Sequence, residues 1–256
     1  MKYFCNIKIK NRHLVGLFNR AISFIEKGIK PVWVFDGLPP NLKRKELSKR
    51  KKLKQEAKEN LAEAKETGNL EKQLKEHKRQ VKMTSKVVDD AMKMLSLMGF
   101  PVIKASAEAE AQCVELLKQK VVDAVASEDM DCLTFGCSML LRGFKSKDKT
   151  IVEIELSKVL QSLELTMDQF VDFCILCGCD YCDSIKNMGP VKALKYIKEY
   201  KTIEKVLEAL EKDNKNDKMK LKFIIPKGDD FLFEEARKLF FTPDVLKETP
   251  KVIIFY

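Results

Sequence analysis

The spacing of apolar residues divides much of the chain into helices and strands. Apolar residues at positions 14, 17, 18, 21, 22 and 25 recur at helical spacing and predict a helix over residues 14–27. Short apolar runs at 31–35, 99–103 and 121–126 predict buried strands, and residues 107–118 predict a helix between the last two. Strands that alternate with helices indicate an α/β fold with a mostly parallel central sheet.

Two long stretches follow the first strand and have little apolar face. Residues 42–65 are helical in pattern but polar almost all round, Thr67-Gly68-Asn69 breaks them, and a second helix is predicted from about Leu70 to Met98. Such a pair packs poorly in a core, so we expect it to project as an arch. From Leu156 onward the pattern is helical, with a Gly-Pro turn at 189–190.

Most of the net positive charge lies on these two predicted polar helices. The formal net charge is +10 and the pI is about 9.1. Residues 42–86, called here the basic segment, hold 16 Lys/Arg and 7 Asp/Glu, so the remainder of the chain sums to only +1. If the segment is helical, Lys43, Arg50 and Lys54 fall within about 20° of one face. This stripe indicates a polyanion-binding element with steep salt dependence, and the alternative is a solvated charged helix face.

Composition excludes several classes of protein. Hydrophobic residues make up 45% and charged residues 34%, as in a globular chain, and no apolar stretch approaches the roughly 20 residues that span a bilayer. We therefore expect no membrane partner. The first eleven residues lack the continuous apolar core of a signal peptide, and the simpler compartment for eight cysteines in 256 residues is a reducing one with free thiols.

Six carboxylates share one position, at or just after the end of an apolar segment. They are Asp36, Glu108, Glu110, Asp129, Asp131 and Asp180. Because ligands bind beyond the carboxyl ends of strands in open α/β sheets, those that follow strands are expected to converge. Glu108 and Glu110 diverge by about 200° within a helix, so they serve one site only at its N-terminal end.

Gathered carboxylates repel one another unless a cation neutralises them. Oxygen ligands select Mg²⁺ or Mn²⁺, and two such ions about 4 Å apart can hold a phosphodiester and stabilise its cleavage. The competing interpretation is that these are unrelated surface acids and helix caps. Their placement beside a basic segment favours the metal site.

The cysteines at 174, 177, 179 and 182 admit two interpretations. They resemble a zinc knuckle, but the loop between the two pairs is shorter than structural zinc sites use, and the preceding residues are core-like. Buried thiols are therefore the favoured interpretation. His13 and His77 have no evident partner, so no Ser/His/Asp or Cys/His nucleophile is indicated.

Four strings of residues resemble the flap endonuclease family, which comprises structure-specific 5′ nucleases. They are KPVWVFDGLPP (30–40), LSLMGFPVIKASAEAEAQC (95–113), SEDMDCLTFG (127–136) and QFVDFCILCGCDYCDSIKNMGPVKA (169–193), with weaker similarity from about His13 onward. The resemblance, closest to the eukaryotic and archaeal flap endonucleases, implies a PIN-like nuclease body, a helical arch insertion and a helix–two-turn–helix DNA-binding element.

The resemblance also implies roles for individual residues. It makes Asp36, Glu108 and Glu110 ligands of a first Mg²⁺, and Asp129, Asp131 and Asp180 ligands of a second. It places Lys43 and Arg50 on the scissile phosphate. It assigns DNA contacts to Arg20, Lys54, Lys82, Gly189 and Lys192, with Ser184, Ile185 and Met188 in a hairpin that holds duplex backbone and a monovalent K⁺.

The sequence departs from the family in three places. Asn187 and Val191 stand where the family usually has Gly and a basic residue, so we expect weakened duplex binding. No acidic residue precedes Glu26, although the family carries one more metal-binding Asp on an N-terminal strand, so the first metal site is expected to be one ligand short. The chain also stops before the usual final helices and lacks the sliding-clamp peptide, and we interpret it as truncated at both ends or as a divergent paralogue.

The expected organisation has four parts: residues 1–41 as the incomplete start of the nuclease body, 42–86 as the basic arch, 87–155 as the body with the metal site, and 156–256 as the helical part. We expect a monomeric nuclear enzyme that hydrolyses a phosphodiester at the base of 5′ DNA flaps. Two alternatives are a 5′ exonuclease acting on duplex ends and a catalytically impaired paralogue that binds branched DNA.

Overall fold

The computed structural model describes residues 12–66, 71, 84–144, 150–215, 222–226 and 231–248. They belong to two compact units that interleave along the chain. The first unit comprises residues 1–37, 47–105 and 248–256, and the second comprises residues 38–46 and 106–247. Residues 1–11, which precede the first helix where the family carries its N-terminal strand, and Lys82 of the basic segment lie outside the described residues.

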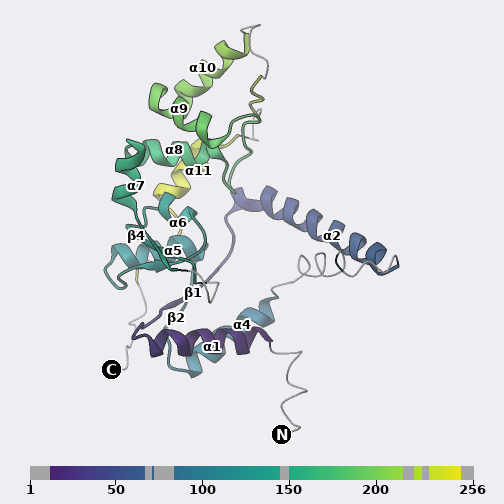
Figure 1. Ribbon diagram of the computed structural model, residues 1–256, viewed down its shortest axis with the longest axis vertical. Helices are drawn as coiled ribbons and strands as arrows, with labels where there is room; N and C mark the ends of the chain where they lie inside the picture. Colours follow the sequence, from purple (N-terminus) through teal and green to yellow (C-terminus); the bar gives the residue numbers. More distant parts are fainter. Residues whose placement is uncertain are drawn as a thin grey trace. The chain divides into compact units, whose positions relative to one another are not determined.

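The first unit is built on a pair of parallel strands. Its elements are α1 (Arg12–Glu26), β1 (Trp33–Phe35), most of α2 (Arg44–Glu66), α4 (Ser85–Leu97) and β2 (Val102–Lys104) (Figure 1). β1 pairs with β2 in parallel, with Trp33 opposite Val102. Helices α1 and α4 pack together through apolar faces that bury Ala21 and Leu95 completely, and the ring of Trp33 lies between those of Phe24 and Phe100.

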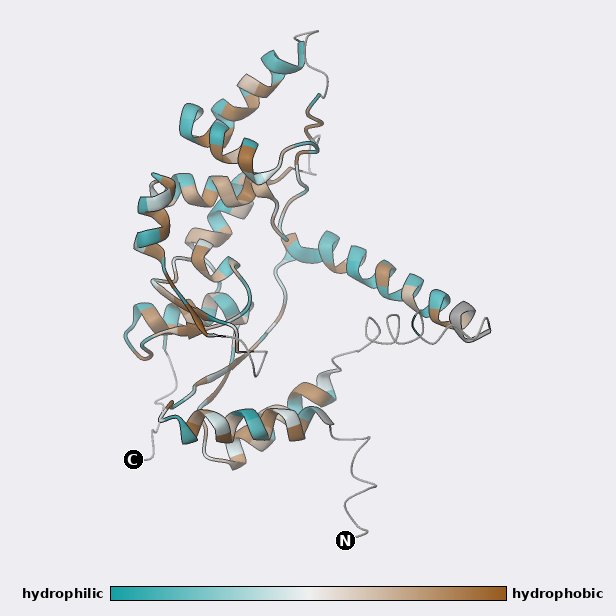
Figure 2. Ribbon diagram, in the orientation of Figure 1, coloured by the Kyte–Doolittle hydropathy of each residue, from teal (hydrophilic) through white to brown (hydrophobic). Residues whose placement is uncertain are grey.

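Helix α2 contrasts with these packed helices. It occupies the place predicted for the first polar helix, and Figure 2 shows it hydrophilic along most of its length. The prediction of one continuous helix from 70 to 98 is wrong at Thr84. That residue is extended, and its side chain accepts a hydrogen bond from the backbone N–H of Val87, so it caps the start of α4. A Thr at this position offers an alternative to helical continuation, and the pattern of apolar residues does not record it.

The second unit contains a three-stranded sheet and most of the helices. Its elements are the 3₁₀ helix η1 (Asn41–Lys43), α5 (Ala109–Lys118), β3 (Val125–Ala126), α6 (Asp131–Thr134), β4 (Met139–Arg142), β5 (Val152–Glu155), α7 (Leu156–Leu163), α8 (Met167–Cys177), α9 (Pro190–Tyr200), α10 (Ile203–Lys215) and α11 (Phe233–Phe241). β3 pairs with β4 in parallel, and β4 pairs with β5 in antiparallel fashion. The mixed α/β class predicted from the sequence is confirmed, and two of the three strand pairings among the described residues are parallel.

The antiparallel strands β4 and β5 were not predicted. β5 is half exposed and carries Glu153 and Glu155, so its composition does not give the apolar run that marks a buried strand. Its pairing with β4 comes from main-chain hydrogen bonds, which strands form with little regard to side-chain polarity. The predicted four-part division of the chain stays a prediction.

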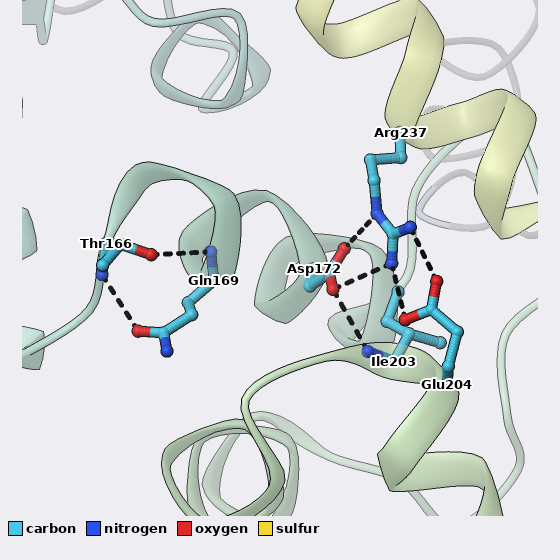
Figure 3. A network of polar contacts seen from close by, with 6 residues as sticks. All are labelled: Thr166, Gln169, Asp172, Ile203, Glu204 and Arg237. Carbon is cyan, nitrogen blue, oxygen red and sulfur yellow. Dashed lines mark hydrogen bonds and ion pairs between the residues drawn. The ribbon is translucent and has the colours of Figure 1, made fainter.

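An ion-pair network around a buried carboxylate ties α8 to α10 and α11 (Figure 3). Asp172 of α8 is 4% exposed, and Arg237 of α11 donates to both of its carboxylate oxygens, at 2.7 and 2.9 Å. The backbone N–H of Ile203 donates to the same carboxylate at 3.1 Å, and Arg237 also holds Glu204. At the start of α8, a capping box between Thr166 and Gln169 sets where the helix begins.

Candidate active site

Glu108 stands at the start of α5 as its N-cap residue, in extended conformation, and is only 7% exposed. Two donors meet its carboxylate, one on each oxygen: the ammonium of Lys43 and the hydroxyl of Tyr181. A carboxylate buried to this degree requires such partners, because an unpaired buried charge is costly. Glu108 is therefore fixed in orientation by side chains that come from two other segments of the second unit.

Lys43 lies at the end of η1, whose backbone places its ammonium among the acids. Its Nζ binds Glu108 and lies 3.1 Å from Asp180, and it sits 5.9 Å from the centre of the Tyr181 ring. Burial by itself lowers the pKa of Lys43, but the two carboxylates outweigh it and the pKa is raised. Lys43 therefore stays charged at neutral pH.

A tight turn after α8 carries two of these side chains. The helix ends at Gly178, whose φ of 110° is open to glycine, and a Cβ there would lie 2.8 Å from the Ser184 hydroxyl oxygen. Cys179 and Cys182 pair across the turn as an antiparallel bridge, with Asp180 and Tyr181 at its centre. The turn thus points one carboxylate and one hydroxyl at Lys43 and Glu108.

Asp129 lies on the loop that leads from β3 into α6, and Asp131 is the first residue of α6. The backbone N–H of Asp129 donates to the Ser127 hydroxyl, and that of Asp131 donates to the Asp129 carboxylate, each at 3.0 Å. Burial, together with the charges of the neighbouring carboxylates, raises the pKa of Asp131 to about 6, although Lys43 acts in the opposite direction. The carboxylates that raise it are Asp129, Asp180 and Glu108, so these four form one acidic cluster.

The structure thus brings together four of the six predicted metal ligands. Glu110 lies in the first turn of α5. Burial raises the pKa of the Cys132 thiol, and the charge of Glu110 contributes to the same rise. Asp36 is exposed directly after β1 in the first unit, as the position of the strand predicted. The shared role of the six residues in a metal site stays a prediction.

Chemically, the acidic cluster suits a hard divalent cation. Within the described ranges, no three His, Cys, Asp or Glu side chains are placed as a ready-made metal site. The donors of the cluster are all carboxylate oxygens, the ligands that Mg²⁺ and Mn²⁺ prefer. Their mutual repulsion contributes, after burial, to the raised pKa of Asp131. One positive charge, that of Lys43, already lies between Glu108 and Asp180. The residues therefore fit a cation of this class.

Among the described residues of the first unit, the predicted DNA-contacting cations are exposed. Arg20 of α1 is exposed, as are Arg50 and Lys54 four residues apart on α2. Helix α2 begins at Arg44, so Lys43 precedes it in η1 and its ammonium is engaged by the acidic cluster. Of the three basic residues predicted to share one helix face, Arg50 and Lys54 both lie on α2, four residues apart and therefore on the same side. Lys43 does not belong to this helix.

The hairpin between α8 and α9 is anchored by apolar residues and by Asn187. Ile185 and Met188 are buried, and Gly189 is the N-cap of α9, with Pro190 following. Asn187 has a φ of 68°, the left-handed conformation in which Asn is tolerated better than most residues, and its side chain donates to the Lys222 carbonyl at 2.7 Å. An Asn can therefore occupy the position where the family usually has Gly.

Lys192 lies in the first turn of α9 and contacts the same hairpin. Its ammonium donates to the Asn187 carbonyl at 3.0 Å and lies 4.8 Å from the centre of the Phe223 ring. Neither partner was predicted, because both contacts join residues that the sequence pattern does not relate.

Tyr181 is a residue of this site for which the sequence predicted no contact. It was present in the string that resembles the family, yet its hydroxyl was given no role. Its ring is 2% exposed and packs edge-on against Phe240 at 5.1 Å. A Tyr directly after a predicted metal-binding Asp, at the end of a core helix, is the signal that could have identified it, because a buried Tyr hydroxyl usually finds a partner.

The fold and the acidic cluster suit a centre that binds divalent cations, and comparison with known proteins specifies the family. The XPG N-terminal domain matches residues 3–57 and the XPG I-region matches residues 99–180. Flap endonuclease 1-1 of Paramecium tetraurelia is 50% identical over 92% of this chain, and flap endonuclease 1 of Tetrahymena thermophila is 50% identical over 92%.

Solved structures agree. Flap endonuclease-1 of Methanococcus jannaschii is 30% identical, with a TM-score of 0.63 over 91% of this chain and 68% of that one. The catalytic core of Rad2 in complex with DNA substrate is 27% identical, with a TM-score of 0.71 over 94% of this chain and 75% of that one. The chain belongs to the flap endonuclease family. It spans about 60% of the length of the curated relatives from Paramecium and Tetrahymena.

Proposed function

We propose that this chain is a structure-specific 5′ nuclease that hydrolyses a phosphodiester at the base of 5′ DNA flaps. The observation that carries the proposal is the acidic cluster of Glu108, Asp129, Asp131 and Asp180, into which Lys43 and Tyr181 point. Membership of the flap endonuclease family supports it independently. Among the residues that the structure describes, no helix is both long and apolar enough to cross a membrane.

We assign three of the six predicted ligands to each of two metal ions, as the family resemblance implies. Asp36, Glu108 and Glu110 would hold one Mg²⁺, and Asp129, Asp131 and Asp180 would hold a second, with Mn²⁺ as a substitute. Two such ions supply a hydroxide near neutral pH and stabilise the leaving oxygen.

The chain's own side chains position the substrate. The Lys43 ammonium, charged at neutral pH and beside the acidic cluster, is placed to donate to a phosphate oxygen and to neutralise charge that develops there. Tyr181 keeps one oxygen of Glu108 engaged, so that this carboxylate holds a single orientation whichever cation it faces. Preorganised groups of this kind lower the barrier because they need not reorient during the reaction.

DNA phosphates would also be held by exposed cations, with Arg50 on the scissile phosphate as the family resemblance implies. Arg20, Arg50 and Lys54 are exposed cations suited to phosphate contacts, which fix register without reading sequence. At the hairpin, the N-terminus of α9 at Gly189 offers backbone N–H groups to a phosphate, and Lys192 adds a charge beside it. A K⁺ ion in this hairpin, and action in the nucleus, are further parts of the proposal.

Comparing substrates tests the function. The chain is mixed with Mg²⁺ and with a labelled double-flap DNA, a blunt duplex or a single strand, and the products are sized. We expect cleavage near the base of the 5′ flap, little cleavage of the other two DNAs, and none after chelation. Stepwise shortening of the blunt duplex from its 5′ end would favour an exonuclease instead. Tight binding of flap DNA without metal-dependent product would favour an impaired DNA-binding paralogue.

A further inference from the structure

Two thiols face each other across the turn that carries Asp180 and Tyr181. The Sγ atoms of Cys179 and Cys182 lie 3.7 Å apart, and the two residues form an antiparallel bridge. Residues directly opposite in such a pairing have Cα atoms about 4.5–5.5 Å apart, within the range of about 4.4–6.8 Å that a disulfide requires. The backbone therefore already satisfies the geometry of a crosslink, although both thiols are free.

The pair is also accessible. Both cysteines are partly exposed, whereas Cys132 and Cys137 are completely buried at 0% exposure. Cys177 is partly exposed as well, but it lies on α8, before Gly178 turns the chain into the bridge. Within the part of the chain that the structure describes, an oxidant that reaches these thiols thus finds a paired partner across the turn.

We propose that Cys179 and Cys182 are a reversible oxidation site. A low-molecular-weight disulfide such as oxidised glutathione oxidises the two thiols to an intramolecular disulfide. One thiolate attacks a sulfur of the oxidant, which forms a mixed disulfide and releases one glutathione. The second cysteine thiolate then attacks the protein sulfur of that mixed disulfide, and the second glutathione leaves. The two protons of the cysteines end on the two glutathione thiols, and the two electrons reduce the oxidant.

Closing the bond moves the residues between the cysteines. A disulfide holds its sulfurs about 2.05 Å apart, roughly 1.7 Å closer than these thiols lie. The crosslinked ring contains only Asp180 and Tyr181 between its ends, so the turn must tighten around them. The Lys43–Asp180 ion pair is 3.1 Å long, and a displacement of this size breaks or lengthens it.

Formation of this disulfide would also change contacts within the acidic cluster. Asp180 and Tyr181 both touch the Lys43–Glu108 pair, so oxidation loosens Lys43 from its partners. If the chain is a nuclease as proposed above, a shift near 1 Å at such a site costs on the order of a hundredfold in rate. In a reducing compartment the pair rests as free thiols, and a disulfide there is transient, as in redox-sensing proteins.

The crosslink is tested without DNA or metal. The chain is equilibrated with glutathione buffers of rising oxidised fraction, quenched in acid, alkylated and mapped by mass spectrometry. We expect an intramolecular Cys179–Cys182 disulfide that dithiothreitol reverses. Cys182→Ser should instead stop at a mixed disulfide of glutathione on Cys179, and Cys177→Ser, the matched control, should behave as the parent does. Both thiols remaining alkylatable, or a mixed disulfide as the only product of the parent chain, would overturn the proposal.

A second measurement follows the displacement. Acylation of Lys43 by an amine-reactive ester is compared in reduced and oxidised chain by peptide mass spectrometry. We expect several-fold faster acylation after oxidation, and no such change in Cys182→Ser. An equal rate in the two states would overturn the coupling of the crosslink to Lys43. Neither measurement depends on cleavage of DNA, so a failure of the proposed nuclease function leaves both results interpretable.

Discussion

Replacing Arg237 by alanine should lower the free energy of unfolding of the second unit more than any substitution of an exposed residue on the same helix. Asp172 is 4% exposed and receives three hydrogen bonds, two of them from the guanidinium of Arg237, at 2.7 and 2.9 Å (Figure 3). Arg237→Ala leaves that carboxylate with the Ile203 N–H as its one remaining partner among these three. Breaking a buried pair from one side costs about 3–5 kcal/mol.

The lower end of that range applies here because the Arg237 side chain is 26% exposed, so water partly compensates for its loss. We therefore expect a loss of roughly 3 kcal/mol, which corresponds to a decrease in Tm of roughly 6–12 °C. Urea unfolding followed by circular dichroism gives the free energy from the midpoint and slope. The matched control is Lys238→Ala, an exposed neighbour on α11.

Two results would refute this reasoning. A loss below about 1 kcal/mol for Arg237→Ala would mean that the buried carboxylate is not held by the guanidinium. An equal loss for Lys238→Ala would mean that the helix, and not the ion pair, accounts for the change. The double variant Asp172→Asn/Arg237→Ala should lose less than the sum of the two single losses, because removing both charges leaves no unpaired carboxylate.

Three further predictions follow from the same structure. Hydrogen bonds from Arg237 lower the pKa of Glu204 to about 2 from its usual 4.5, so Glu204 contributes stability above pH 4.5 that is lost as the pH falls towards 2, and Glu204→Gln should reduce this acid-induced fall in Tm. Gly178→Ala should destabilise the chain by about 1–3 kcal/mol in urea unfolding, since it combines a positive φ with a clash at Ser184, whereas Gly16→Ala should not. Lys43→Ala should lower the single-turnover rate of flap cleavage by about a hundredfold, and an unchanged rate would remove Lys43 from the reaction.

The sequence predicted the location of the acids better than their contacts. Asp129 and Asp131 follow a strand and Glu108 begins a helix, as expected, because strand ends and helix starts can be read from the spacing of apolar residues. The contact of Lys43 with Glu108 and Asp180 could not be read in this way. Lys43 and Glu108 lie 65 positions apart, and the contact between them depends on tertiary packing that no local pattern records.

Where the sequence analysis failed, tertiary or capping contacts decided the structure. Thr84 starts a helix where the apolar pattern predicted continuation, because its hydroxyl accepts from the Val87 N–H. Strand β5 exists although its residues are half polar, because β4 offers it a hydrogen-bonding edge. The hydroxyl of Tyr181 donates to Glu108, 73 positions away in the sequence, so this contact depends on tertiary packing.

The measurement that tests the central claim most directly is cleavage of a labelled double-flap DNA in Mg²⁺ by the chain and by two aspartate variants. Asp129→Ala removes a carboxylate of the acidic cluster, whereas Asp123→Ala removes an exposed aspartate outside it. If the cluster is the nuclease centre, the parent and Asp123→Ala release the flap at similar rates and Asp129→Ala gives no product above the metal-free background. Equal cleavage by the parent and Asp129→Ala, or no metal-dependent product from the parent, would contradict the account.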